Sequence, residues 1–232
     1  MNFDVERMLL PTQPLSISGF ALVPHALPSD ECEEFAVRAR PPTSGVGTRC
    51  LLPQAWCASL ALRLRENVEI SKLIPVDHVA VKCTYFEKST DQNWLVPVHQ
   101  DLSIPVAERV PDPQLRGWSE KEGSTFVQAP LEILEQLVAV RLHLDPCGID
   151  DGPLRVVPGS HKLGVLSPEQ ALRVRDEFSE HSCELQQGGA LVMRPLSLHA
   201  SSKAKGTSRR RVLHFVFGPR SLGYGLRWQH AV

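Results

Sequence analysis

Short, strand-like runs separated by turn residues fill the chain from about residue 76 to residue 232. They include DHVAVKCTYFE, LVAVRLHLD and RRRVLHFVFGP, with Pro, Gly and polar residues between them. Val, Ile, Leu and Phe favour strands at this density, and many short strands in close succession are typical of a barrel or a double sheet. We therefore predict a mainly β core over residues 76–232. One further strand is predicted in LSISGFALV (15–23), and the simplest organisation is a single domain over residues 1–232.

Helical patterns lie mostly before this core, and we expect residues 1–75 to form a helical buttress with flanking helices. One helix is predicted from Pro28 to about Arg40 and another from Pro53 to about Asn67, where AWCASLALRLREN has apolar residues at helical spacing. PPTSGVG (41–47) is expected to be the loop between them. A third helix is predicted within SPEQALRVRDEF (167–178), because Ser, Pro and Gln occupy the N-cap, N1 and N3 positions.

Composition narrows the class of protein. A net charge of −1 gives no basic surface excess of the kind that favours nucleic acid or anionic lipid. No stretch approaches eighteen apolar residues, and MNFDVERMLL lacks the apolar run of a secretory signal, so we expect neither a membrane span nor export. The 6 cysteines are scattered without a CxxC pair, which indicates reduced thiols and a cytoplasmic protein.

Two segments carry residues that suit a metal site. VPVHQDLSIPV (96–106) contains His99 and Asp101, which share one face if the segment is a strand. A second β-like run, GGALVMRPLSLHAS (188–201), ends in His199. A non-haem ferrous site needs two imidazoles and one carboxylate on one face of the metal. His99, Asp101 and His199 are therefore candidate ligands, although a hydrogen-bonded structural histidine remains the simpler interpretation of either imidazole alone.

A basic run follows His199. Arg210 shares strand parity with His214, whereas Arg211 shares the parity of Leu213, whose face is expected to pack against helices. We therefore predict that Arg210 enters the cavity, where its guanidinium can bind a carboxylate in bidentate fashion. Arg209 and Arg211 are expected to belong to a solvated loop.

A polar stripe lies in VRLHLD (140–145). Arg141, His143 and Asp145 share one face, and apolar residues fill the other. Periodicity leaves open whether this polar face meets solvent or lines a cavity.

Three motifs together resemble the phytanoyl-CoA dioxygenase (PhyH) family of Fe(II)/2-oxoglutarate oxygenases. They are H-x-D at 99–101, DDGPLRVVPGSHKLG (150–164) and HASSKAKGTSRRR (199–211), and the similarity extends from about residue 76 to the end. The resemblance implies a double-stranded β-helix (jelly-roll, cupin-like) core with helices against one sheet.

The resemblance also implies roles for single residues. His99, Asp101 and His199 would bind iron, and Arg210 would pair with the far carboxylate of 2-oxoglutarate. Arg141 occupies a position where some members place an aromatic cosubstrate contact, which makes it a second candidate for cosubstrate binding.

Three further residues are candidates for substrate binding. Residues 107–130 are polar and turn-rich, as in a flap, and Trp118 and Lys121 lie within them. Trp94 precedes the H-x-D segment and is expected near the pocket mouth. A loop anchored by its Trp explains Trp118 equally well.

The implied function is an Fe(II)/2-oxoglutarate-dependent dioxygenase that uses O₂ to hydroxylate a small or medium organic molecule, with decarboxylation of 2-oxoglutarate to succinate. Its partner is a small-molecule substrate, with no nucleic acid or membrane involved. Two alternatives remain open: a non-catalytic cupin-like binding or sensing protein, and a His/Asp/His zinc hydrolase.

Overall fold

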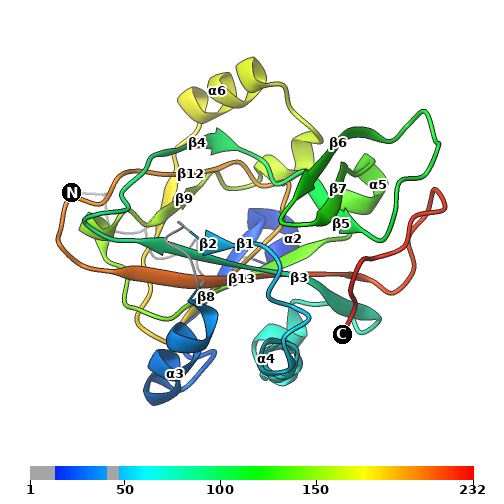
Figure 1. Ribbon diagram of the computed structural model, residues 1–232. Helices are drawn as coiled ribbons and strands as arrows, with labels where there is room; N and C mark the ends of the chain where they lie inside the picture. Colours follow the sequence, from blue (N-terminus) through cyan, green and yellow to red (C-terminus); the bar gives the residue numbers. More distant parts are fainter. Residues whose placement is uncertain (1–13, 41–46) are drawn as a thin grey trace.

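Two antiparallel sheets face each other at the centre of the molecule (Figure 1). The computed structural model describes residues 14–40 and 47–232, so the predicted loop at 41–47 lies outside the described residues except for Gly47. The larger sheet has the order β1-β11-β8-β13-β3-β2, with β1 at Phe20–Val23, β11 at Ala190–Met193, β8 at Val138–His143, β13 at Arg210–Pro219, β3 at His78–Lys88 and β2 at Gly47–Thr48. This arrangement confirms the predicted mainly β core.

Two smaller sheets complete the β structure. The sheet opposite the large one has the order β10-β9-β12-β4, with β10 at His181–Cys183, β9 at Leu154–Val156, β12 at His199–Ser201 and β4 at Val96–His99. A three-stranded sheet lies at one end of the molecule (Figure 1), with β5 at Ser103–Val106, β7 at Ser124–Gln128 and β6 at Arg116–Lys121.

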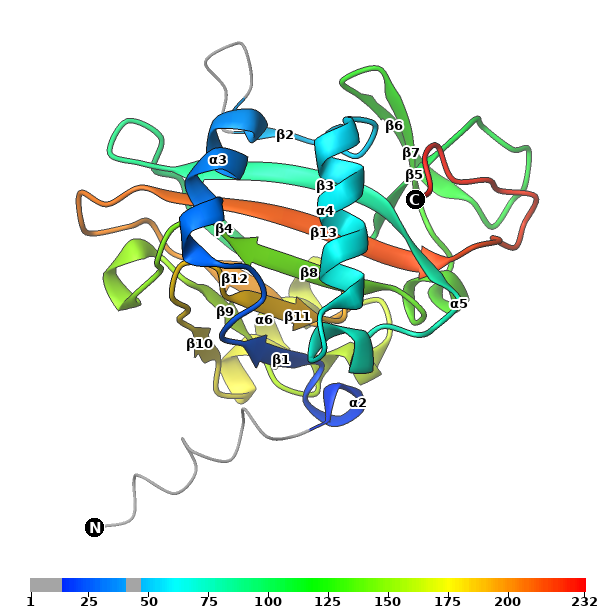
Figure 2. The same ribbon diagram turned by 90° about the horizontal axis from the view of Figure 1, so that it is seen from below.

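Helices cover the outer faces of the two main sheets. The predicted helices are confirmed as α3 (Ser29–Ala39), α4 (Ala55–Glu66) and α6 (Pro168–Glu177), and α6 begins with the expected capping box at Ser167. Figure 2 shows α3 and α4 side by side across the large sheet. The remaining helical turns are α2 (Leu15–Ser18), α5 (Leu131–Leu134), η2 (Ile70–Lys72), η3 (Ile149–Asp151) and η4 (Ser160–Leu163). In the part of the chain that the structure describes, no helix has the length and apolar character needed to cross a membrane.

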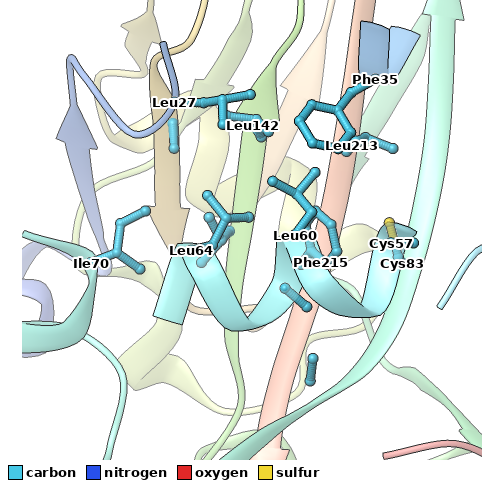
Figure 3. Packing of buried hydrophobic residues seen from close by; sticks show 14 of the residues in the cluster. Leu27, Phe35, Cys57, Leu60, Leu64, Ile70, Cys83, Leu142, Leu213 and Phe215 are labelled. Carbon is cyan, nitrogen blue, oxygen red and sulfur yellow. The ribbon is translucent and has the colours of Figure 1, made fainter. Parts of the chain in front are cut away.

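The packing of α4 fixes the large sheet from outside. Leu60 and Leu64, one helical turn apart, are 0% and 1% exposed, whereas Leu62 on the opposite face is 46% exposed. Figure 3 shows Leu60 and Leu64 beside Leu142 of β8 and Phe215 of β13. Full burial of each leucine stabilises the fold by about 1.5–3 kcal/mol, and the contact excludes water from the outer face of the sheet. The inner face is left for the site.

Two of the predicted strands are interrupted. The run at 15–23 begins as the helical turn α2 and becomes a strand only at Phe20, because Gly19 has φ +82° and ends the turn in the left-handed region. The run at 188–201 is divided between two sheets, β11 in the large sheet and β12 in the small one. The chain turns between them, where the Ser197 amide donates to the Arg194 carbonyl (2.9 Å). This crossing carries His199 to the sheet opposite β11.

The predicted flap at 107–130 contains the hairpin β6–β7. Its turn, Glu122–Gly123, has φ of 52° and 73°, which matches a two-residue hairpin turn whose positive φ values follow the twist of the strands. The Glu122 carboxylate accepts from Thr48 Oγ1 (2.6 Å) and from the Arg49 amide (2.9 Å). The hairpin tip is thereby tied to β2 at the edge of the large sheet.

Candidate metal centre

Two neighbouring strands place the candidate imidazoles side by side. His99 ends β4, His199 begins β12, and the two are direct partners in the antiparallel register, with ring centroids 4.3 Å apart. Asp101 Oδ1 lies 3.9 Å from His99 Nε2, and Asp101 Oδ2 lies 3.8 Å from His199 Nε2. Among the described residues, this is the one group of three or more potential metal-ligating side chains with all its ligand atoms within 4.8 Å of one another.

Hydrogen bonds fix both imidazoles in the form that binds a metal. His99 Nδ1 lies 2.8 Å from the Pro97 carbonyl, and His199 Nδ1 lies 2.8 Å from the Ser197 carbonyl. Because a carbonyl can only accept, Nδ1 carries the proton in each ring and Nε2 presents a lone pair. Both Nε2 atoms lie within 4 Å of an Asp101 carboxylate oxygen. The donor set of two neutral imidazoles and one carboxylate therefore fits a ferrous ion.

Asp101 is not part of the same strand as His99. The sequence predicted one continuous strand, but β4 ends at His99 and β5 begins at Ser103. Asp101 is held in the intervening link by its amide, which donates to the Pro195 carbonyl (2.9 Å). The shared orientation of the two side chains is therefore maintained by the turn that precedes β12 and not by strand pairing.

Gln100 is a supporting residue that the sequence reasoning missed. It is 9% exposed, and its amide donates to the carbonyls of Gly164 and Leu196 at 2.8 and 2.7 Å. Its Oε1 accepts from the Leu166 amide (2.9 Å). These contacts hold the link between the candidate ligands from the side opposite the cavity. The only indication in the sequence was a polar residue between His99 and Asp101. Its hydrogen-bond partners are distant in the chain, so the sequence alone did not show its role.

The group opens into a cavity of about 210 Å³ on the inner face of the large sheet. Arg210 and Arg141 both line it, and they are 3% and 7% exposed. Of the polar stripe, Arg141 therefore faces the cavity rather than solvent, whereas Asp145 pairs with Arg211 and does not line the cavity. Arg210 Nη1 donates to the Gly152 carbonyl (2.6 Å), and the Nε atoms of both arginines have no hydrogen-bond partner among the described residues. Two buried guanidiniums with unused donors suit an acidic ligand.

The prediction that Arg211 belongs to a solvated loop is wrong. It is 7% exposed and forms ion pairs with Asp145 (2.7 Å) and with Glu33 of α3 (2.6 Å). The predicted parity is nevertheless correct, since Arg211 lies on the helix side of β13 and Arg210 on the cavity side. Arg209, with a side chain 52% exposed and paired with Glu87 at 3.2 Å, is the more solvated residue of the run.

His214 is a further buried imidazole beside the group. Its Nε2 lies 3.6 Å from Asp101 Oδ2, and its Nδ1 has no hydrogen-bond partner in the described part of the chain. The strand parity that placed Arg210 in the cavity already placed His214 on the same face. Burial lowers the pKa of His214 to about 3, so the ring is neutral near pH 7.

The protonation states of the group suit a divalent cation. Burial lowers the pKa of His199 to about 4. Burial alone would raise the pKa of Asp101, but the neighbouring His199, His214 and Lys82 hold it well below its usual range. At neutral pH the Asp101 carboxylate is therefore charged and the His199 imidazole is neutral, which is the form that coordinates metal without first releasing protons.

The predicted substrate-binding residues lie in different surroundings. Trp94 lines the cavity. Trp118 packs against an apolar cluster of the flap and the C-terminal segment, with the Arg109 guanidinium 5.7 Å from its ring, and it is not among the cavity-lining residues. Lys121 Nζ lies 5.2 Å from the centroid of Phe126.

Comparison with known proteins gives one family and a set of similar structures. The family described as Phytanoyl-CoA dioxygenase (PhyH) matches residues 17–212. A stretch of 83 residues is 34% identical to "Dioxygenase cnsJ" of Penicillium expansum, and this stretch covers 36% of the chain but only 24% of that relative.

Two solved structures share the fold over most of both chains. The non-heme alpha ketoglutarate dependent epimerase SnoN from nogalamycin biosynthesis has a TM-score of 0.63 at 14% identity, with 93% of this chain and 84% of that chain covered. HygX from Streptomyces hygroscopicus, solved with nickel and 2-oxoglutarate bound, has a TM-score of 0.60 at 17% identity, with 94% and 87% covered. These likenesses confirm the predicted jelly-roll core.

Proposed function

The chain belongs to the phytanoyl-CoA dioxygenase (PhyH) family, and from this premise we propose that it is an Fe(II)/2-oxoglutarate-dependent dioxygenase that hydroxylates a small or medium organic molecule. The observation that carries the proposal is the convergence of two Nε2 lone pairs and one carboxylate beside two buried arginines with unused donors. HygX, which shares the fold, was solved with a metal and 2-oxoglutarate bound.

Each residue has a specific task in this proposal. His99, Asp101 and His199 would hold iron(II) on one face, which leaves the opposite face for small ligands. Arg210 would bind the distal carboxylate of 2-oxoglutarate, and Arg141 would neutralise a second part of the same dianion. When bound, iron(II) supplies the activation of O₂ that couples decarboxylation of 2-oxoglutarate to hydroxylation of the substrate.

The protein contributes geometry and a protected volume. The Nδ1–carbonyl hydrogen bonds of the two histidines and the side-chain hydrogen bonds of Gln100 orient the three ligands before any metal binds. The cavity holds the cosubstrate and the reacting part of a small substrate, and the buried inner face of the large sheet limits the access of water. We propose that Trp94 contacts the substrate at the cavity wall and that Trp118 anchors the flap.

Anaerobic titration tests the proposal. Addition of 2-oxoglutarate to the iron-loaded protein should produce a visible charge-transfer band, and admission of O₂ should release succinate. His99→Ala should abolish the band, whereas His25→Ala, at an exposed histidine, should leave it unchanged. A protein that retains iron but forms neither the band nor succinate would contradict the proposal in favour of a non-catalytic role.

A further inference from the structure

The charges of the cavity do not balance once iron and 2-oxoglutarate are counted. Three cationic side chains, Lys82, Arg141 and Arg210, line it together with a single carboxylate, Asp101. Iron(II) would add two positive charges and the 2-oxoglutarate dianion would remove them. Two positive charges then remain in a largely buried space, where an uncompensated charge is costly.

Of these three cations, Lys82 and Arg141 both lack a hydrogen bond or ion pair among the described residues, whereas Arg210 donates to the Gly152 carbonyl. Among the described residues the Lys82 ammonium makes neither a hydrogen bond nor an ion pair, and it lies 5.8 Å from the centroid of the Phe126 ring. Burial lowers the pKa of Lys82, Asp101 opposes this effect, and Arg49 and Lys121 add to it. The side chain therefore lies in a place where a further negative charge is stabilising.

A second lysine approaches the same ring from the flap. Lys121 Nζ lies 5.2 Å from the Phe126 centroid, and it too has no hydrogen bond or ion pair within the described part of the chain. Neither of the adjacent carboxylates, Glu120 and Glu122, pairs with Lys121, and Glu122 instead accepts from Thr48 and Arg49. Two ammonium groups thus share one aromatic neighbour, and of the two lysines only Lys82 is among the cavity-lining residues.

The position of Lys82 separates it from the proposed cosubstrate site. In the register of β3 and β13, Arg210 pairs with Lys88, His214 with Thr84, and Val216 with Lys82. Six residues of strand span roughly 20 Å, so Lys82 and Arg210 stand at opposite ends of this face. His214, which contacts Asp101, lies between them. A cosubstrate held by Arg210 therefore approaches the metal ligands from the end opposite Lys82.

We propose that the substrate carries an anionic oxygen group, a carboxylate, phosphate or sulfate, that binds between Lys82 and Lys121 over Phe126. Thr84, whose buried Oγ1 has no partner among the described residues, lies on the same face between this position and the metal ligands. This inference rests on the proposed function and names its substrate class.

Matched acids and neutral analogues provide the test. The full chain is loaded with nickel(II), which binds without turnover, and saturated with 2-oxoglutarate. Hexanoate, 3-phenylpropanoate and phenyl phosphate are then compared with hexanamide, 3-phenylpropanamide and phenol, first by ligand-observed NMR and then by calorimetry. At least one acid should bind, and its neutral analogue should bind at least about tenfold more weakly, because a charge-assisted contact is lost.

Substitutions assign the effect to the two lysines. Lys82→Met should weaken binding of the acid about tenfold and Lys121→Met several-fold, with the neutral analogue unaffected. Lys72→Met, at an exposed lysine of η2, should change nothing. Thermal melts of each variant establish that it is folded.

Several results would overturn the inference. One is equal binding of acids and neutral analogues, and another is no binding of any acid to the wild type. A third is undiminished binding of the acid by a variant that carries both Lys82→Met and Lys121→Met. Loss of 2-oxoglutarate binding in Lys82→Met would instead assign this lysine to the cosubstrate. Failure of the proposed function is distinguishable, because the wild type would then not bind 2-oxoglutarate at all.

Discussion

At the scale of single residues, two adjacent arginines show how strand parity divides the site from the scaffold. Arg210 and Arg211 are both almost completely buried, but they lie on opposite faces of β13. Arg210 faces the cavity, and its Nε has no hydrogen-bond partner among the described residues. Arg211 donates hydrogen bonds to Asp145 and Glu33. The same side-chain chemistry therefore serves ligand binding at one position and stability at the next.

Replacement of Arg210 separates binding from folding. Arg210→Met should raise the dissociation constant for 2-oxoglutarate by about a hundredfold, because a charge-assisted bidentate contact is lost. Metal binding should persist, since the three candidate ligands are untouched. Calorimetric titration of the nickel-loaded variant with 2-oxoglutarate measures both, and an unchanged affinity would remove Arg210 from the cosubstrate site.

Replacement of Arg211 should have the opposite result. Arg211→Met leaves Asp145 buried without its partner, and we expect the free energy of unfolding to fall by about 3–5 kcal/mol. Arg209→Met, at an exposed ion pair, should cost less than about 1 kcal/mol. Urea unfolding measures both values. An Arg211 variant as stable as the wild type would contradict the structural role.

The buried histidines predict a pH dependence of the metal-free protein. Burial lowers the pKa of His199 to about 4 and of His214 to about 3, and it lowers the pKa of His143 well below the usual value. In the unfolded chain these groups take up a proton below about pH 6.5, so the unfolded state binds more protons between pH 6.5 and 4. Stability should therefore fall as the pH decreases through this window.

The expected loss is about 2 kcal/mol for each histidine between pH 7 and pH 5. Urea midpoints at the two pH values measure it, and His25→Gln, at an exposed position, should leave the difference unchanged. Equal midpoints at both pH values would show that these rings are not buried in the neutral form.

Sequence reasoning identified the candidate ligands but not their support. His99, Asp101, His199 and Arg210 stand in recognisable spacings and at readable strand parity. Gln100 was missed because its three partners belong to turns some 60 to 100 residues away, as the contacts with Leu166 and Leu196 show. Contacts of this kind have no local pattern.

At the scale of elements, helix α4 illustrates how an outer layer holds the inner one. Leu60→Ala should lower the free energy of unfolding by about 2–5 kcal/mol, because it removes a fully buried side chain from the contact with β8 and β13. Leu62→Ala, on the exposed face of the same helix, should change stability by less than about 0.5 kcal/mol. Chemical denaturation of both variants measures the difference, and equal effects would contradict the observed orientation of α4.

Element boundaries were predictable where local chemistry sets them. The capping box at Ser167 placed the start of α6, and apolar spacing placed α4. The run at 188–201 was predicted as one strand because its composition is uniformly β-like, whereas the turn before His199 sends its two halves to different sheets. Tertiary pairing, which composition does not encode, decided the outcome there.

At the scale of the whole molecule, the two opposed sheets bring residues 100 positions apart into contact. β12 pairs with β4 so that His199 meets His99, while β13 of the facing sheet delivers Arg210 and His214 to the same cavity. The helices reinforce the large sheet from outside (Figure 2) and leave its inner face free. The architecture thus explains how a set of scattered polar residues forms one site.

The most direct measurement is a crystal structure of the protein grown anaerobically with iron(II) and 2-oxoglutarate. We predict one metal ion bound by His99 Nε2, an Asp101 oxygen and His199 Nε2, with the distal carboxylate of 2-oxoglutarate on the Arg210 guanidinium. A metal-free cavity at saturating iron, or 2-oxoglutarate bound away from Arg210, would contradict this prediction.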